Sequence, residues 1–213
     1  RAESAALKAS FEQIGYVHKP EYLPIYRNIN EQLWIAFEQG KINRNDLRIR
    51  RFEQLFLTIG LEDNPAELSK LYLKNLSEQT TLIASAEKML ADLSNHCQFV
   101  IVTNGLKDVQ RPRLRRSSIF HYFTDVIISE EVGYAKPDPG FFDITFERLN
   151  YPAKEDVLIV GDSLSSDIKG GNNYQIDACW FNPNKKQPEP ELKIKYEITS
   201  LNELKDIILI PLQ

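Results

Sequence analysis

Residues 161–167 carry the pattern with the clearest chemistry. They read GDSLSSD and directly follow the apolar run 157–160. Asp162 comes just past this expected buried strand and Asp167 in the early turns of the helix that should follow, so both carboxylates can face one point. Hard oxygen ligands of this kind suit Mg²⁺, which typically takes one or two protein carboxylates. The alternative is that Asp162 caps the helix and Asp167 complements its dipole.

Two shorter motifs add groups that can bind a phosphate. Thr103, Asn104 and Gly105 end another apolar run and begin a helix, where a hydroxyl, an amide and backbone N–H groups can hold an anion. Lys136 precedes a proline, which keeps the lysine extended and directs its compact ammonium group. Both motifs also have ordinary explanations, because Thr103 or Asn104 can simply cap a helix and Lys136 can be a solvated loop lysine.

Composition limits the class of protein. The 213 residues include 26 Lys and Arg, 30 Asp and Glu and 42% hydrophobic residues, for a formal net charge of −4. This acidic balance argues against a nucleic-acid binder, and the basic run 111–116 is typical of a solvated helix face. No apolar run approaches the ~18 residues that a membrane span requires. Cys97 and Cys179 are too few for a disulfide scaffold. We therefore expect a soluble cytoplasmic protein that acts on a small molecule and binds neither nucleic acid nor membrane.

The expected elements divide the chain into two domains, residues 1–80 and 81–213. The first domain shows helical periodicity and almost no strand signal, with glycines as stops and an Asn-Pro start signal. Its four expected helices cover about residues 2–14, 21–39, 44–59 and 65–76.

The second domain alternates helices with short apolar strands. The expected strands are residues 99–102, 125–128, 157–160 and 178–181. Continuous apolar strands joined by helical crossovers indicate a parallel sheet covered on both faces. Ligands bind at the carboxyl ends of such strands, where Thr103 and Asp162 are placed. The predicted fold class is α/β, a Rossmann-like parallel sheet with an added helical domain.

In this order, the three motifs resemble motifs two, three and four of the haloacid dehalogenase superfamily of phosphohydrolases. The helical first eighty residues look like the four-helix cap domain of that superfamily. The resemblance covers essentially the whole chain. Four segments resemble its pyrimidine 5′-nucleotidase branch, namely residues 28–34, 36–41, 161–171 and 179–183.

The resemblance implies Mg²⁺-dependent hydrolysis of a phosphate monoester, a nucleotide, through an aspartyl-phosphate. Thr103 and Asn104 would bind the transferring phosphoryl group, Lys136 would offset the charge of nucleophile and phosphate, and Asp162 with Asp167 would hold the metal directly or through water. Two other interpretations stay open. One is a haloacid dehalogenase, against which the acidic pair argues, and the other is a non-catalytic domain that binds phosphate and metal.

One part of the superfamily pattern is missing. Its first motif, a DxDxT strand end that supplies the nucleophile and the general acid/base, has no counterpart, because no Asp-x-Asp occurs before residue 80. That strand should lie between the strands that end at Thr103 and Val160. Its absence would leave two rows of backbone groups unpaired, at about 1–3 kcal/mol for each buried group. We therefore expect the natural chain to begin about a dozen or more residues before Arg1, and residues 1–213 alone to be inactive.

Overall fold

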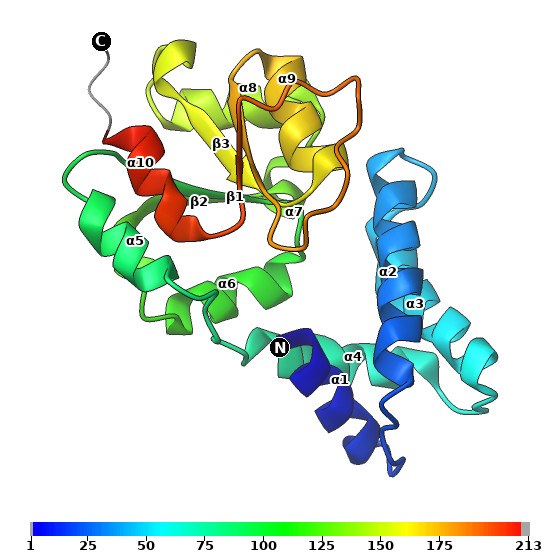
Figure 1. The fold of residues 1–213 in the computed structure, drawn as a ribbon. Coiled ribbons are helices and arrows are strands. Elements are labelled where there is room, and N and C mark those ends of the chain that lie inside the picture. Colours follow the sequence, from blue (N-terminus) through cyan, green and yellow to red (C-terminus); the bar gives the residue numbers. More distant parts are fainter. Residues whose placement is uncertain (1, 210–213) are drawn as a thin grey trace. The chain divides into compact units, whose positions relative to one another are not determined.

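The computed structural model describes residues 2–209 (Figure 1). They form two compact units, which are treated separately below. The first comprises residues 2–81 with 108–117, and the second residues 82–107 with 118–209. No helix in the described part of the chain is long and apolar enough to cross a membrane.

The first unit contains the four helices predicted from periodicity. Asn43 and Asp46 form a capping box at the start of the third helix, which ends at Gly60 with a φ of 68°. Asn64 caps the fourth helix and Pro65 occupies its first turn. The four helices are α1 (Ala2–Gln13), α2 (Tyr22–Glu38), α3 (Arg44–Ile59) and α4 (Pro65–Ser77).

Three aromatic rings join α2, α3 and α4 in the core of this unit. The rings of Tyr26, Phe52 and Tyr72 lie in mutual contact, with centroids 5.5 Å, 5.3 Å and 5.2 Å apart, and all three residues are buried. Large buried rings of this kind contribute much of the apolar area that stabilises a small helical unit. The apolar stripes of the helices thus meet in a single core.

Helix α6 (Lys107–Arg116) groups with the first unit by its contacts, although it follows residue 80. Arg113 donates from Nε to the Gln79 carbonyl at 2.9 Å, and Arg116 donates to the Ser77 carbonyl at 3.2 Å. Part of the basic run that was expected to form a solvated face therefore anchors α6 to the end of α4.

The second unit is an α/β structure whose strand pairs are all parallel, which confirms the predicted fold class. The strands of this unit are β1 (Phe99–Thr103), β2 (Phe123–Ile128), β3 (Leu158–Gly161), β4 (Asp177–Phe181) and β5 (Tyr196–Ile198). The sequence does not predict the short strand β5. The longer helices of the unit are α5 (Ala86–Leu93), α8 (Pro139–Arg148), α9 (Lys169–Tyr174) and α10 (Leu204–Ile208), with the single turn α7 (Ser129–Val132).

Helices cover both faces of the strands, as the continuous apolar runs predict (Figure 1). Along β4, Ala178 and Trp180 belong to a buried cluster that includes residues of α8, whereas Cys179 belongs to another cluster with residues of α5 and α10. This alternation follows from the two-residue period of a strand. Both faces of β4 are therefore core.

The sheet is interrupted between β1 and β3. In the described part of the chain, β1 pairs with β2 and β3 pairs with β4, and these pairs belong to separate sheets with the orders β1-β2 and β3-β4-β5. All five residues of β1 are only partly buried, and Val160 in β3 is 37% exposed. The strand that we expect between them stays a prediction, but the two strands that would flank it are not paired directly.

Candidate active site

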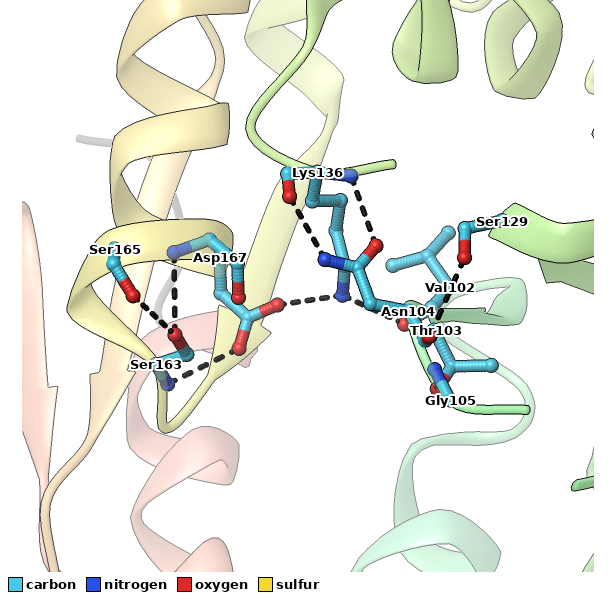
Figure 2. Close-up of polar contacts among 10 residues, drawn as sticks. Val102, Thr103, Asn104, Gly105, Ser129, Lys136, Ser163, Ser165 and Asp167 are labelled. Atoms are coloured by element: carbon cyan, nitrogen blue, oxygen red, sulfur yellow. Dashed lines mark hydrogen bonds and ion pairs between the residues drawn. The ribbon is translucent and has the colours of Figure 1, made fainter. Parts of the chain in front are cut away.

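Lys136 lies at the centre of a polar cluster at the carboxyl ends of β1 and β3 (Figure 2). Its ammonium Nζ donates to the carbonyl of Val102 at 2.9 Å and to Oδ1 of Asp167 at 2.6 Å. The side chains of Lys136 and Asp167 are only 6% and 10% exposed. A buried charge requires a partner of this kind, because a charge without one would remain costly to desolvate. The structure therefore brings together all three sequence motifs: the strand end before Thr103, Lys136, and Asp167.

Asn104 fixes the backbone of Lys136. Its side-chain Nδ2 donates to the Lys136 carbonyl at 2.8 Å, and its Oδ1 accepts from the Lys136 N–H at 2.9 Å. Asn104 is itself buried, and its own carbonyl accepts from the Ser129 hydroxyl at 3.3 Å. The geometry assigns Asn104 the task of positioning the lysine, whereas the predicted contact between Asn104 and a phosphoryl group stays a prediction.

Thr103 forms a tight turn at the end of β1. Its Oγ1 accepts from the Gly105 N–H at 3.0 Å. A hydroxyl oxygen that accepts in this way still carries one hydrogen that it can donate. Thr103 can therefore serve both interpretations made from the sequence, a local cap and a donor to an anion.

Asp167 is positioned by the loop that leaves β3. Its Oδ2 accepts from the Ser163 N–H at 3.1 Å, while Ser163 Oγ caps the next turn through the Ser166 N–H at 3.1 Å. A Cβ atom at Gly161 would lie 2.2 Å from Asp167 Oδ2, so only glycine leaves room for the carboxylate. The sequence alone gives no signal for this role of Gly161, because the contact that requires glycine is with a side chain six residues further along the chain.

Asp162 lies beside this pair at the end of β3. Burial raises the pKa of the Asp162 carboxyl, the Asp167 charge raises it further, and the charges of Lys136 and Lys186 oppose these effects. The Asp162 carbonyl accepts from the Trp180 indole N–H at 3.2 Å, which joins the loop to β4. The two carboxylates thus repel one another at the place where the sequence predicts a metal.

These residues fit Mg²⁺ by their donor chemistry. Asp162 and Asp167 offer hard oxygen ligands, and a dication would relieve the repulsion between them. The residues described in the structure contain no group of three or more His, Cys, Asp or Glu side chains that could hold a metal ion. Mg²⁺ usually keeps several waters and binds through one or two carboxylates, so a pair is sufficient for it.

Comparison with known proteins identifies the family. The family model for haloacid dehalogenase-like hydrolases matches residues 7–181. The chain belongs to this family. This hydrolase is 39% identical over 207 residues to YfnB of Bacillus subtilis, which is named only as an HAD-hydrolase. The match covers 97% of this chain and 88% of YfnB.

Two further relatives of this haloacid dehalogenase-like hydrolase carry more specific names. The pyrimidine 5′-nucleotidase PynA of Streptococcus pneumoniae is 32% identical over 208 residues, covering 97% of this chain and 88% of PynA. The pyrimidine 5′-nucleotidase YjjG of Escherichia coli is 32% identical over 183 residues, covering 86% of this chain and 80% of YjjG.

Solved structures agree with the family assignment. The crystal structure of YfnB, described as bound to magnesium and as showing interdomain movement, matches with a TM-score of 0.93 and covers 98% of this chain and 92% of that one. The L-2-haloacid dehalogenase of Xanthobacter autotrophicus matches with a TM-score of 0.77 at 16% identity, covering 100% of this chain and 94% of that one. The second likeness shows the shared fold alone.

Proposed function

We propose that this hydrolase removes phosphate from phosphate monoesters in a Mg²⁺-dependent reaction. The observation that carries the proposal is the buried ion pair of Lys136 and Asp167 with Asp162 beside it, at the carboxyl ends of two parallel strands. Charged phosphate esters are very slow to hydrolyse, and an anionic nucleophile needs cations beside the phosphate in order to approach it. The site offers one such cation, Lys136, and two carboxylates that would bind a second one, Mg²⁺.

Each site residue has a role in this proposal. Asp162 and Asp167 would hold Mg²⁺ directly or through water, and the bound metal would neutralise charge on the phosphate oxygens. Lys136 keeps one of its three donors for the phosphate, since the Val102 carbonyl and Asp167 take the other two. Thr103 would donate its hydroxyl hydrogen to a phosphate oxygen.

The proposed nucleophile is a carboxylate on a strand that lies between β1 and β3. In the described part of the chain, the edges of β1 and β3 that face away from their partner strands are unpaired, and Lys136 contacts Val102 of β1; both observations support that position. The carboxylate oxygen would bond to phosphorus while the bond from phosphorus to the ester oxygen breaks, and a general acid would protonate the departing alcohol. Water would then hydrolyse the aspartyl-phosphate, release inorganic phosphate and restore the carboxylate.

We further propose pyrimidine nucleoside 5′-monophosphates as substrates. This proposal is supported by the relatives PynA and YjjG, which are both named pyrimidine 5′-nucleotidases. A cytoplasmic location goes with it, since Cys97 and Cys179 are both free thiols, which suits a reducing compartment.

The test is an assay of the protein expressed from its natural gene. We expect phosphate release from uridine or thymidine 5′-monophosphate with Mg²⁺, little release from adenosine 5′-monophosphate, and none in EDTA. A 2-haloacid serves as the control substrate. Metal-independent halide release would replace the proposal with a dehalogenase, and absence of phosphate release from any monoester would refute it.

A further inference from the structure

Trp180 in β4 is a buried aromatic residue whose one polar atom reaches the candidate site. It is 1% exposed and belongs to the same buried cluster as Phe141 and Ile168. The indole Nε1–H donates to the Asp162 carbonyl at 3.2 Å. A buried indole needs an acceptor for this N–H, because the group cannot reach water. The hydrogen bond therefore fixes the ring and the Asp162 carbonyl relative to one another.

Strand register explains how a ring in β4 reaches this carbonyl. Gly161 is the last residue of β3 that pairs with β4, and its partner is Trp180. Asp162 is the next residue along the chain and begins the loop. The indole ring thus extends the contact between the two strands by one residue beyond their backbone pairing.

The Asp162 carbonyl and the Ser163 N–H belong to the same peptide unit, and both are hydrogen-bonded. The carbonyl accepts from Trp180, and the N–H donates to Oδ2 of Asp167 at 3.1 Å. A peptide unit is planar, so the direction of its carbonyl determines the direction of its N–H. Trp180 therefore sets the direction from which the Ser163 N–H meets Asp167.

The hydrogen bonds continue from Asp167 to the other sheet (Figure 2). The second carboxylate oxygen, Oδ1, accepts from Lys136 Nζ at 2.6 Å, and the same ammonium donates to the Val102 carbonyl at 2.9 Å. A continuous chain of hydrogen bonds thus runs from Trp180 in β4 through the peptide unit, Asp167 and Lys136 to β1. Bonds in such a chain polarise and strengthen one another, so loss of the bond at one end should weaken the next.

Two local hydrogen bonds also hold this loop, and their effect is separate from that of Trp180. Ser163 Oγ accepts from the Ser166 N–H at 3.1 Å, and the Ser163 carbonyl accepts from the Asp167 N–H at 3.0 Å. Neither bond includes a group of the peptide unit between Asp162 and Ser163. These two bonds fix the turn, whereas the indole fixes that peptide unit.

We propose that Trp180 is a positioning residue of the active site, whose indole N–H orients the peptide unit between Asp162 and Ser163 and through it the Asp167 carboxylate. In this role it touches neither metal nor substrate. The inference rests on the proposed function for the task of the two carboxylates, which is to bind Mg²⁺. It adds a residue from outside the three sequence motifs to the site.

The experiment removes the indole N–H and follows the Ser163 amide in the protein expressed from its natural gene. Without Mg²⁺, hydrogen exchange at this amide, measured by NMR, should accelerate at least about 10-fold in Trp180→Phe, because its bond to Asp167 opens more often. Mg²⁺ affinity, measured by calorimetry, should fall about 3- to 10-fold, as expected for the loss of one hydrogen bond. Phe142→Leu is the matched control, since it loosens the same buried cluster without touching the peptide unit.

A second replacement keeps the ring and removes only the donor. In a Trp34→Phe background, Trp180 is the one tryptophan of residues 1–213 and can be replaced by benzothienylalanine. This analogue carries sulfur where indole carries the N–H, so the core stays filled. It should reproduce the faster Ser163 exchange of Trp180→Phe. Wild-type exchange with the analogue would overturn the proposal even if Trp180→Phe were misfolded.

The remaining outcomes separate this inference from the proposed function. Equal Ser163 exchange in Trp180→Phe and Phe142→Leu would overturn the inference. So would faster exchange with the Mg²⁺ affinity of the wild type, which would mean that the indole only braces the loop. A wild-type protein that binds no Mg²⁺ would defeat both the inference and the proposed function. Mg²⁺ binding that depends on the indole, without hydrolysis of any phosphate ester, would defeat the proposed function alone.

Discussion

The Lys136 ammonium lies 2.6 Å from Asp167 Oδ1 in a pair that is almost completely buried. Lys136 comes from the loop before α8 and Asp167 from the turn after β3, so the pair joins the two sheets of the second unit at their carboxyl ends. Removing one partner from a buried pair leaves the other charge uncompensated. The ion pair therefore couples the stability of this unit to its proposed chemistry.

Lys136→Met should lower the free energy of unfolding by about 3 kcal/mol, because Asp167 would keep a buried charge without its partner. Urea denaturation measures this change. Arg148→Met is the control, since it removes the more exposed Arg148–Asp125 ion pair of 2.7 Å and should change the free energy by less than about 1 kcal/mol. Equal effects of the two substitutions would contradict the assigned role of the buried pair.

Gly161→Ala should displace Asp167, because the added Cβ would lie 2.2 Å from Asp167 Oδ2. We expect a loss of about 1–3 kcal/mol in unfolding free energy and a larger loss of phosphatase activity. Gly171→Ala is matched to it, since its Cβ would meet Ile159 Cγ2 at 2.7 Å in the core. If both variants lose activity only in proportion to their stability, Gly161 has no special relation to the site.

Asp162→Asn should reduce Mg²⁺-dependent turnover at least about 100-fold in the protein expressed from its natural gene, because it removes one of two proposed metal ligands. The fold should persist, since the substitution also removes the repulsion from Asp167 that raises the pKa of Asp162. Activity assays and thermal denaturation measure the two effects. Activity equal to that of the wild type would exclude the metal role of Asp162.

The two thiols should differ in reactivity. Burial raises the pKa of the Cys179 thiol to about 12 from an ordinary value of 9.0, with a smaller contribution from Glu203. Burial also raises the pKa of Cys97, which is only partly buried. At pH 8 we expect a thiol reagent to label Cys97 in the native protein and Cys179 only after unfolding. Rapid labelling of Cys179 in the folded protein would show that its environment is open.

The same thiol makes stability depend on alkaline pH. Because the folded state holds the Cys179 proton more tightly than the unfolded state, this contribution is complete below pH 9 and is lost as pH rises toward 12. Between pH 9 and pH 10.5 the loss should be about 2 kcal/mol. The loss is measured as the difference between wild type and Cys179→Ala, which cancels the other titrating groups. If the free energy of unfolding falls equally with pH in the wild type and in Cys179→Ala, this assignment is refuted.

Local patterns in the sequence were sufficient for the helices of the first unit and for four of the strands. Asparagine caps, glycine stops and apolar periodicity are signals within a few residues of one another, and they located α3, α4 and β3 closely. Strand β5 has three residues with an exposed Glu197 in the middle, and so short a segment carries no periodicity.

The sequence predicts which residues form the proposed site, but it does not predict which of them contact one another. The contacts of Asn104 with Lys136 cross 32 residues, and the ion pair of Lys136 with Asp167 crosses 31. Spacing within a motif cannot reveal such contacts, because they depend on how two crossovers return to one edge of the sheet. The requirement for glycine at Gly161 is of the same kind.

The interruption between β1 and β3 has a consequence for amide hydrogen exchange. Successive amides along a strand point to opposite edges, so a strand paired on one side protects alternate amides only. In the described part of the chain β1 and β3 are each paired on one side, whereas β4 lies between β3 and β5. Slow exchange at successive residues should therefore be confined to residues 179 and 180 of β4, which pair on both sides, and β1 and β3 should show slow exchange at alternate residues until another strand fills the space between them.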